Sequence, residues 1–253
     1  MTNKLTQFLV DEWQAHRKGG LYHKTQVQLA YNSNRIEGSK LTEDQTRYIF
    51  ETRTIGFKDQ EAVPVDDIIE TTNHFVAFDH LLRTINEPLT EDLIKDFHRI
   101  LKTGTADAQK AYFNVGDWKK LANEVGGHDT CRPADVEKEM CELRKWYSSQ
   151  TDVTILTLAE YHWRFESIHP FQDGNGRVGR LVLFRECLRN SIMPFVIDNE
   201  HKLYYYRGLS EFKQAPGFLV GTMQSAQDVY EAWIRYFNEE LLEGLKIGSS
   251  ILA

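Results

Sequence analysis

Twelve consecutive residues bring together the side chains that could handle a polyphosphate: His169-Pro170-Phe171-Gln172-Asp173-Gly174-Asn175-Gly176-Arg177-Val178-Gly179-Arg180. The glycines on either side of Asn175 allow a crowded or left-handed turn, in which successive backbone N–H groups form a concave anion site. The pattern of residues 177–189 predicts a helix. The anion site would then lie at a helix N-terminus, where unpaired amides and the helix dipole favour phosphate.

Four side chains of this stretch carry distinct chemistry. Arg177 and Arg180 are three positions apart, so they are neighbours on one helix face, and two guanidinium groups suit two successive phosphates. Asp173 is a hard oxygen ligand that could join substrate phosphates in holding Mg²⁺. His169 is the one group here that can take up a proton near neutral pH. A glycine-rich helix start or a single histidine is more often structural, but their coincidence in one short stretch favours a functional site.

The stretch resembles the signature of the Fic family, H-P-F-x-[DE]-G-N-G-R-x-x-R, and matches it at every specified position. Fic proteins are transferases that move AMP from ATP onto a protein hydroxyl. The resemblance implies that His169 is the general base and that Asp173 is the Mg²⁺ carboxylate. The other matched residues would hold the phosphates: Gly174, Asn175 and Gly176 at the α- and β-phosphates, Arg177 at the β-phosphate and Arg180 at the γ-phosphate.

An acidic residue far upstream could regulate this site. Glu37 by itself would be a solvated surface acid, but a carboxylate placed against Arg180 would form a bidentate pair in the position of the γ-phosphate. Residues 33–38 resemble the inhibitory motif of Fic proteins, [ST]-x-x-x-E-[GN], with matches at Ser33, Glu37 and Gly38. Because this segment precedes the signature, the chain resembles the class of Fic proteins whose inhibitor lies on an N-terminal helix.

Composition excludes several classes of protein. The net charge of −7 argues against a generic nucleic-acid binder, which normally has a basic face. No apolar run approaches a membrane span, and the N-terminus lacks the apolar region of a signal peptide. Cys131, Cys141 and Cys187 are odd in number and lack metal-site spacing, which is typical of reduced thiols. We therefore expect a cytoplasmic protein with neither a nucleic-acid nor a membrane partner.

Apolar periodicity predicts an all-α fold, a Fic-like bundle of roughly eight to ten helices with one short hairpin. Helices are expected over residues 25–36, 154–168, 177–189 and 226–242, with further starts near Thr42, Pro64, Thr90 and Pro133. We expect residues 1–60 to form N-terminal helices that include the inhibitory helix. Residues 61–253 would form the Fic-like catalytic core, and the two parts are not expected to fold separately.

Helical periodicity fails between residues 104 and 132, where the short segments 112–116 and 123–127 combine extended pieces with glycines. This pattern predicts a small hairpin. In Fic proteins a hairpin flap at this place pairs with the backbone of the target protein, a known mode of peptide recognition. A plain surface hairpin is the alternative. The resemblance also places four residues along the nucleotide pocket: Asn123, Glu124, Val125 and Gly126.

Aromatic residues after the signature could contact the nucleotide base. Tyr205 and Tyr206 match a tyrosine pair that lies beside the adenine in family members, and an aromatic face can stack on a purine. The alternative is that they form the ordinary edge of an amphipathic core. A frequent downstream asparagine of the family is replaced here by Lys213, so the base contacts stay open.

These observations predict a Mg²⁺-dependent protein adenylyltransferase that uses ATP, is restrained by Glu37, and modifies a Ser, Thr or Tyr hydroxyl of a target protein docked on the hairpin flap. Removal of AMP from a modified protein, with Glu37 positioning water, is an alternative within enzymes. Transfer of UMP, phosphocholine or phosphate fits the intact Gly-Asn-Gly less well. A non-catalytic nucleotide-binding module is the alternative from another class. Self-modification and homodimer formation stay open.

Overall fold

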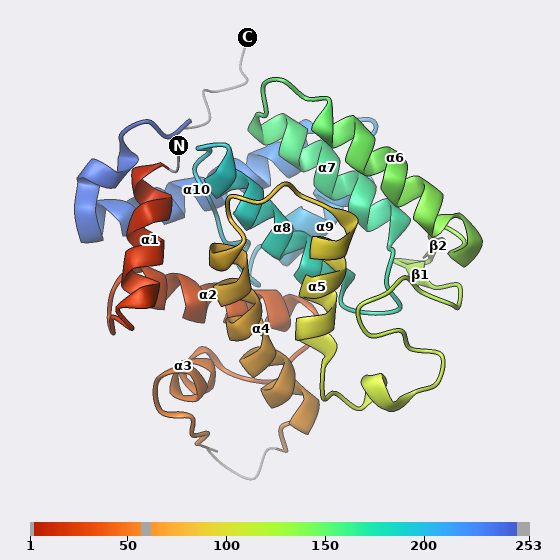
Figure 1. The fold of residues 1–253 in the computed structure, drawn as a ribbon, viewed down its shortest axis with the longest axis horizontal. Helices are drawn as coiled ribbons and strands as arrows, with labels where there is room; N and C mark the ends of the chain where they lie inside the picture. The colour runs from red at the N-terminus through yellow and green to blue at the C-terminus, as the bar shows by residue number, and fades with distance from the viewer. Residues whose placement is uncertain (1–2, 57–61, 247–253) are drawn as a thin grey trace.

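The computed structural model describes residues 3–56 and 62–246 (Figure 1). Within them, ten α-helices carry nearly all of the regular structure, which confirms the predicted all-α fold. The helices are α1 (Lys4–Gln14), α2 (Leu21–Ile36), α3 (Glu43–Thr52), α4 (Val65–Arg83), α5 (Glu91–Lys102), α6 (Val136–Ser148), α7 (Ile155–Ile168), α8 (Asn175–Arg189), α9 (Lys202–Ser210) and α10 (Gly217–Asn238). The boundary expected between residues 60 and 61 falls outside the described residues.

Helix α8, which begins inside the signature, lies at the centre of the bundle (Figure 1). Every residue from Asn175 to Leu188 is buried, and α7, α5, α4, α2 and α1 all pack against the helix. A helix that is covered on all sides must satisfy its polar side chains internally. Arg185 does so by donating to the backbone oxygens of Thr84 and Glu87 and by pairing with Glu186. The signature therefore leads directly into a helix that is buried along nearly its whole length.

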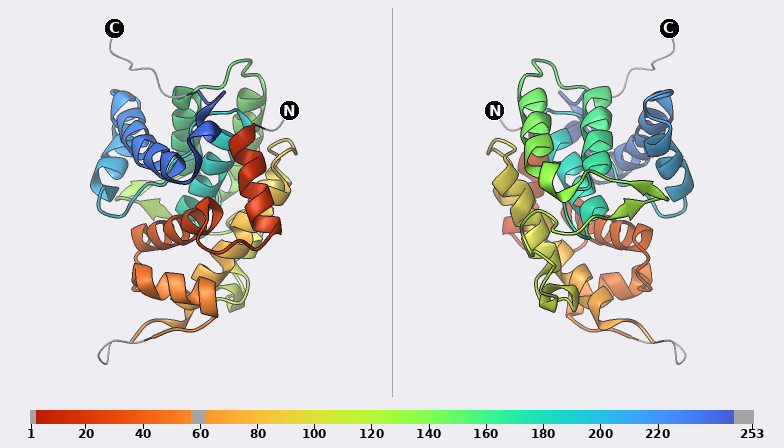
Figure 2. Two further views of the ribbon diagram at one scale, coloured as in Figure 1. Left: turned by 90° about the vertical axis from the view of Figure 1, so that its left-hand side faces the viewer. Right: turned by 90° about the vertical axis from the view of Figure 1, so that its right-hand side faces the viewer.

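The N-terminal helices share the main apolar core with the rest of the chain. Leu5 and Leu9 of α1 and Leu21 of α2 belong to the same buried cluster as Phe78 of α4 and Phe184 of α8. A smaller cluster packs α3 against α2 and α4, and it contains Ala30, Leu41, Ile49 and Phe75. In the two side views, α1 and α2 lie against the body of the bundle while α3 extends below it (Figure 2). The end of α2 is thus placed by core packing.

Several helix limits differ from the predicted ones. Helix α2 begins at Leu21 rather than at residue 25, because the buried carboxylate of Glu12 accepts a hydrogen bond from the N–H of Tyr22 at its start. Helix α10 begins at Gly217 rather than at residue 226. Its first turns contain Gly217 and Gly221, which weaken the helical pattern in the sequence, although Leu219, Val220 and Met223 are buried there. The predicted helix starts at Thr42 and Thr90 are confirmed, and each of these side chains accepts a hydrogen bond from a backbone N–H of the first turn.

The hairpin is smaller than the sequence suggested. β1 (Glu124–Val125) pairs antiparallel with β2 (His128–Asp129), and Gly126 and Gly127 form the turn with φ of +58° and +78°. The predicted extended piece at 112–116 is wrong, because this segment forms turns in which the N–H of Gly116 donates to Nδ1 of His98. None of the described helices combines the length and the apolar character needed to cross a membrane.

Candidate active site

His169 occupies the junction between the two helices that carry the signature. Helix α7 ends at Ile168, and His169 follows in the left-handed conformation with φ of +50°, its N–H donating to the oxygen of Phe165 at 2.9 Å. The imidazole is 16% exposed and its Nδ1 is buried, so solvent reaches the ring from the opposite edge. A left-handed residue at this point turns the chain sharply from α7 toward α8.

The surroundings of His169 keep its imidazole neutral. Burial, followed by the positive charge of Lys119, lowers the pKa of His169 to about 4. A backbone hydrogen bond with Glu166 and the carboxylates of Glu37 and Asp173 oppose this shift in pKa but do not outweigh burial. A neutral imidazole at physiological pH can accept a proton, as a general base must.

The turn after His169 is closed by its own side chains. The N–H of Phe171 donates to Oδ1 of Asn175 at 2.8 Å, and Nδ2 of Asn175 donates back to the oxygen of Phe171 at 2.9 Å. The ring of Phe171 is buried and stacks on His98, with centroids 4.0 Å apart. The Asn175 side chain is thus committed to the turn, and its backbone is what remains for a ligand.

Helix α8 starts at Asn175, with Gly174 before it at φ of +83°. Its first amides have no acceptor within the helix, so the first turn is suited to an anion. A Cβ at position 176 would lie 2.2 Å from Oε1 of Glu37. The carboxylate of Glu37 therefore rests directly against this turn, in contact with the glycine that leaves room for it.

Arg180 joins the central helix to the end of α2. Its Nη2 lies 2.6 Å from Oε1 of Glu37 and 2.9 Å from the backbone oxygen of Ser33, and its Nε donates to Oγ of Ser33 at 3.0 Å. Glu37 pairs with Arg180 as expected, but the prediction of a bidentate pair is wrong. Glu37 contacts only Nη2, because Ser33 accepts the remaining hydrogen bonds from Nη2 and Nε. Burial works against the charge of Arg180, but the Glu37 carboxylate outweighs it and the pKa of Arg180 is raised.

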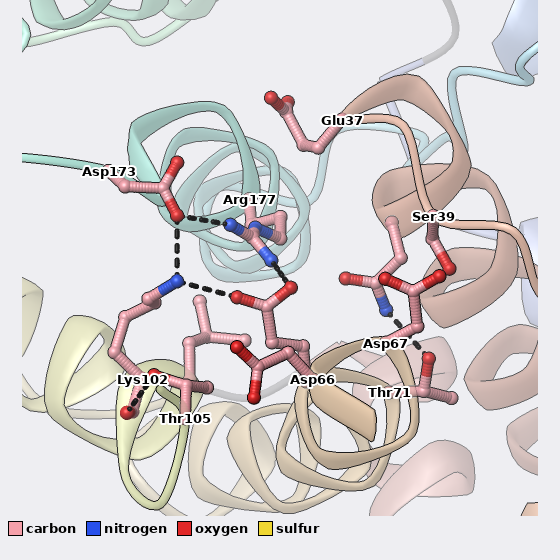
Figure 3. A network of polar contacts seen from close by, with 12 residues as sticks. Glu37, Ser39, Asp66, Asp67, Thr71, Lys102, Thr105, Asp173 and Arg177 are labelled. Carbon is pink, nitrogen blue, oxygen red and sulfur yellow. Dashed lines mark hydrogen bonds and ion pairs between the residues drawn. The ribbon is translucent and has the colours of Figure 1, made fainter. Parts of the chain in front are cut away.

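Arg177 belongs to a second ionic network on the other side of the turn. Its guanidinium is buried and pairs with Glu70 of α4 and, at 2.9 Å, with Oδ2 of Asp173. Lys102, at the end of α5, lies 2.7 Å from the same Asp173 oxygen (Figure 3). Burial of Asp173 would raise the pKa of its carboxyl, but Arg177 and Lys102 outweigh burial and hold that pKa below its usual range.

Asp173 has the properties of a Mg²⁺ ligand. Only its Oδ2 is engaged by the two cations, and its side chain is 45% exposed, so the carboxylate also faces the opening of the site. Among the described residues no group of three or more acids, histidines or cysteines could hold a metal. One carboxylate is sufficient where substrate phosphates and water complete the Mg²⁺ coordination.

The predicted pocket residues of the hairpin divide into two kinds. Asn123 donates to the oxygen of Phe171 at 3.0 Å and accepts from Nζ of Lys119 at 2.7 Å, so its side chain fastens the hairpin to the signature turn. Glu124, Val125 and Gly126 are exposed beyond this anchor. The structure thus places Asn123 beside the signature and the other three at the surface.

The two tyrosines also occupy different places. Tyr205 is 1% exposed, its hydroxyl lies 2.6 Å from Nε2 of His162, and the Arg180 guanidinium lies 5.9 Å from its ring centroid. This burial contradicts the predicted stacking of Tyr205 on a base, because neither ring face is open. Tyr206 is 43% exposed and donates to the oxygen of Ile36 at the end of α2.

Sequence reasoning missed the residues that hold the signature turn from outside it. His98 accepts from Gly116 through Nδ1 and contacts the oxygen of Asp173 through Nε2 at 3.1 Å. Lys102 follows four positions later on the same buried face of α5, and Lys119 supports the hairpin. The spacing of His98 and Lys102 was the available signal, since two polar residues at i and i+4 interrupt an otherwise apolar helix face.

Comparison with known proteins agrees with this arrangement. Residues 88–186 match the model of the Fic/DOC family. A protein adenylyltransferase Fic of Nematostella vectensis is 32% identical over 193 residues, which cover 72% of this chain and 42% of that protein. The chain therefore belongs to the Fic/DOC family, and it spans less than half the length of this curated relative.

Solved structures show the same fold. A Fic domain containing signaling protein from Bacteroides thetaiotaomicron superposes with a TM-score of 0.70 at 22% identity, over 98% of this chain and 100% of that one. Fic-1 (aa134–508) from C. elegans gives a TM-score of 0.66 at 21% identity, over 91% of this chain and 69% of that one. The whole bundle, beyond the matched family segment, is thus a known arrangement.

Proposed function

We propose that this protein transfers AMP from ATP to a hydroxyl group of a protein and that Glu37 restrains the reaction. The supporting observation is the placement of His169, which is neutral and partly exposed, at the entrance to a helix N-terminus flanked by Arg177 and Arg180. The names of the curated relatives, protein adenylyltransferase Fic, point to the same activity.

In this proposal the first turn of α8 binds the phosphates through its backbone amides, with Gly176 allowing close approach. The target hydroxyl gives its proton to the exposed edge of His169, and the hydroxyl oxygen attacks the α-phosphorus of ATP. The bond between the α-phosphorus and the oxygen that bridges to the β-phosphate breaks, and pyrophosphate leaves in line with the incoming oxygen. The guanidinium groups of Arg177 and Arg180 stabilise the negative charge that develops on the phosphates.

Asp173 would hold Mg²⁺ through the oxygen that its two cationic neighbours leave available. When bound, this ion would neutralise phosphate charge and orient the polyphosphate. The chain's own part is to keep Asp173 ionised and fixed in direction, which Arg177 and Lys102 do at 2.9 and 2.7 Å.

The inhibitory role of Glu37 is supported by its position. Its carboxylate contacts Arg180 and the Cα side of Gly176, so it lies where a phosphate would need both groups. A phosphate and the carboxylate would compete for the same guanidinium, and each would repel the other. ATP would bind in its productive place only after Glu37 moves away.

The transfer reaction is tested with the full chain, α-labelled ATP and Mg²⁺, by counting the label retained on protein. His169→Asn is the variant of choice, because asparagine tolerates the left-handed conformation but is not a base at neutral pH. We expect His169→Asn to lose labelling and to keep its affinity for ATP in calorimetry. Retained labelling in this variant would reject the proposed base, and ATP binding without labelling in wild type and Glu37→Gly alike would favour a non-catalytic nucleotide module.

Removal of AMP by the same site is the second candidate, favoured by the 31% exposure of the Glu37 side chain beside His169 and the α8 turn. In that reaction Glu37 would orient water. Incubation of AMP-modified protein with the wild-type chain separates the two. Release of AMP that depends on Glu37 would support removal, whereas a gain of labelling in Glu37→Gly without AMP release in wild type would support transfer.

A further inference from the structure

Lys102 is a buried ammonium group surrounded by acids from three separate segments. Its Nζ lies 2.6 Å from Oε1 of Glu70 on α4, 2.7 Å from Oδ2 of Asp173 in the signature turn, and 3.2 Å from Oδ2 of Asp107 in the short 3₁₀ helix Asp107–Gln109. The lysine side chain is 2% exposed. Figure 3 shows it extending from the end of α5 toward Asp173.

The geometry is that of a filled cation site. An ammonium group has three N–H donors, and three carboxylates each receive one. The N–O distances suit an ammonium ion, whereas Mg²⁺ and Ca²⁺ need oxygens at about 2.0–2.1 and 2.3–2.6 Å. The position between Asp173, Glu70 and Asp107 is therefore occupied by a cation that belongs to the chain.

A second cation acts on the same acid. Arg177 pairs with both Asp173 and Glu70, so each of these two acids is shared by a lysine and an arginine. A divalent ion that approached Asp173 alone would meet the positive charges of Lys102 and Arg177, whose buried side chains are screened less than charges at the surface. Phosphate groups in the first turn of α8 would supply the negative charge that offsets this repulsion.

We propose that Lys102 is an internal cation of the phosphate site and that it makes divalent-metal binding at Asp173 depend on bound nucleotide. The metal would then enter together with the triphosphate and would not occupy Asp173 beforehand. This inference rests on the proposed nucleotide site, and it adds a residue and an order of binding that the signature does not contain.

The test uses Mn²⁺ as the probe, with the full chain and no nucleotide, and measures free Mn²⁺ by electron paramagnetic resonance. Wild type should show no saturable binding at sub-millimolar Mn²⁺. Lys102→Met should gain saturable Mn²⁺ binding at Asp173, at least about tenfold tighter than any binding to wild type, because one of the two positive charges next to this carboxylate is then removed. The same variant should gain thermal stability on addition of Mn²⁺, whereas wild type should not.

Two controls locate the effect. Lys95→Met removes another lysine of α5, which forms an ion pair with Asp117 at 2.7 Å and not with Asp173, and this variant should bind Mn²⁺ no better than wild type. Adding Asp173→Asn to Lys102→Met should abolish the gained site. If Lys102→Met does not fold, Lys102→Gln removes the charge and keeps a hydrogen-bond donor, and the same gain is expected.

Saturable Mn²⁺ binding to nucleotide-free wild type that Asp173→Asn abolishes would overturn the inference, as would a folded neutral variant with no gain. The Mn²⁺-binding and thermal-stability measurements use neither ATP nor a transfer assay. A failure of the adenylyltransferase proposal would appear instead as absent labelling, so it can be distinguished from a failure of the inference about Lys102.

Discussion

Oε1 of Glu37 lies 2.6 Å from Nη2 of Arg180, although 143 positions separate the two residues in the chain. The contact joins the end of α2 to the first turns of α8, beside the glycine turn that begins the helix. Core packing of α2 holds the carboxylate in this place, so its removal is expected to change ligand binding more than folding.

Glu37→Gly should raise ATP affinity by about ten- to a hundredfold, since one charge-assisted hydrogen bond contributes about 1.5–3 kcal/mol that ATP no longer has to displace. Calorimetric titration with ATP and the labelling assay both measure this effect. Ser33→Ala is the matched control, because it removes one neutral acceptor of Arg180 and leaves the carboxylate. An equal rise in both variants would mean that release of Arg180, not loss of the Glu37 charge, controls binding.

The Asn175 side chain should determine the stability of the signature turn. It makes two hydrogen bonds to Phe171 while 1% exposed. Asn175→Ala should lower the free energy of unfolding by about 1–3 kcal/mol, because the buried N–H of Phe171 loses its acceptor and the oxygen of Phe171 keeps only the bond from Asn123. Urea denaturation measures the loss. Asn175→Asp keeps the acceptor but turns a carboxylate oxygen toward the Phe171 carbonyl, so it should not restore stability. A negligible loss in the alanine variant would show that water replaces both bonds.

The protein should lose stability in mild acid. Burial lowers the pKa of His74, His98 and His162 to about 3 and that of His169 to about 4 in the folded state, from an ordinary value of 6.5. Below pH 6.5 the unfolded chain therefore binds protons that the folded chain does not bind. The free energy of unfolding decreases as the pH falls from 6.5 toward 3. Glu166, whose pKa burial raises from 4.5 to about 8, gives the opposite slope between these two values and offsets one of the four histidines.

Urea midpoints at pH 7.5, 6.0 and 5.0 measure this loss, for which we expect about 1–3 kcal/mol per pH unit below 6.5. His98→Gln should reduce the slope, because it removes one of the groups that must stay neutral. The exposed His16 provides the comparison, and His16→Asn should leave the slope unchanged. A stability that is flat from pH 7.5 to 5.0 would contradict the expected neutral histidines.

The half-exposed Tyr206 is the aromatic residue that remains open to a base. If a purine stacks on it, Tyr206→Phe should keep ATP affinity and Tyr206→Ala should lose about tenfold, because the ring face and not the hydroxyl makes the contact. Tyr205→Phe should instead cost about 1 kcal/mol of stability through its lost bond to His162, with ATP affinity unchanged. Calorimetry with ATP separates these results. Equal ATP affinity in Tyr206→Ala and wild type would exclude base stacking at this position.

Local sequence predicted the helical class, the helix starts at Thr42 and Thr90, and a glycine turn in the signature, where Gly174 is left-handed. These features depend on neighbours within a few residues, where side-chain capping and backbone sterics act. The starts of α2 and α10 were misplaced because distant packing, including the Glu12 carboxylate at Tyr22, extends these helices beyond their local signals.

The sequence by itself therefore determined which residues could form a phosphate site, because the signature is contiguous and its spacing is set by one turn and one helix. Only the tertiary structure decided which cations and acids share that site. It brought Glu37 to Arg180, gathered Glu70 and Lys102 around Asp173, and buried Tyr205 against His162. Such contacts depend on how α2, α4, α5 and α9 pack on α8, and charge pairing between remote segments leaves no periodic pattern in the sequence.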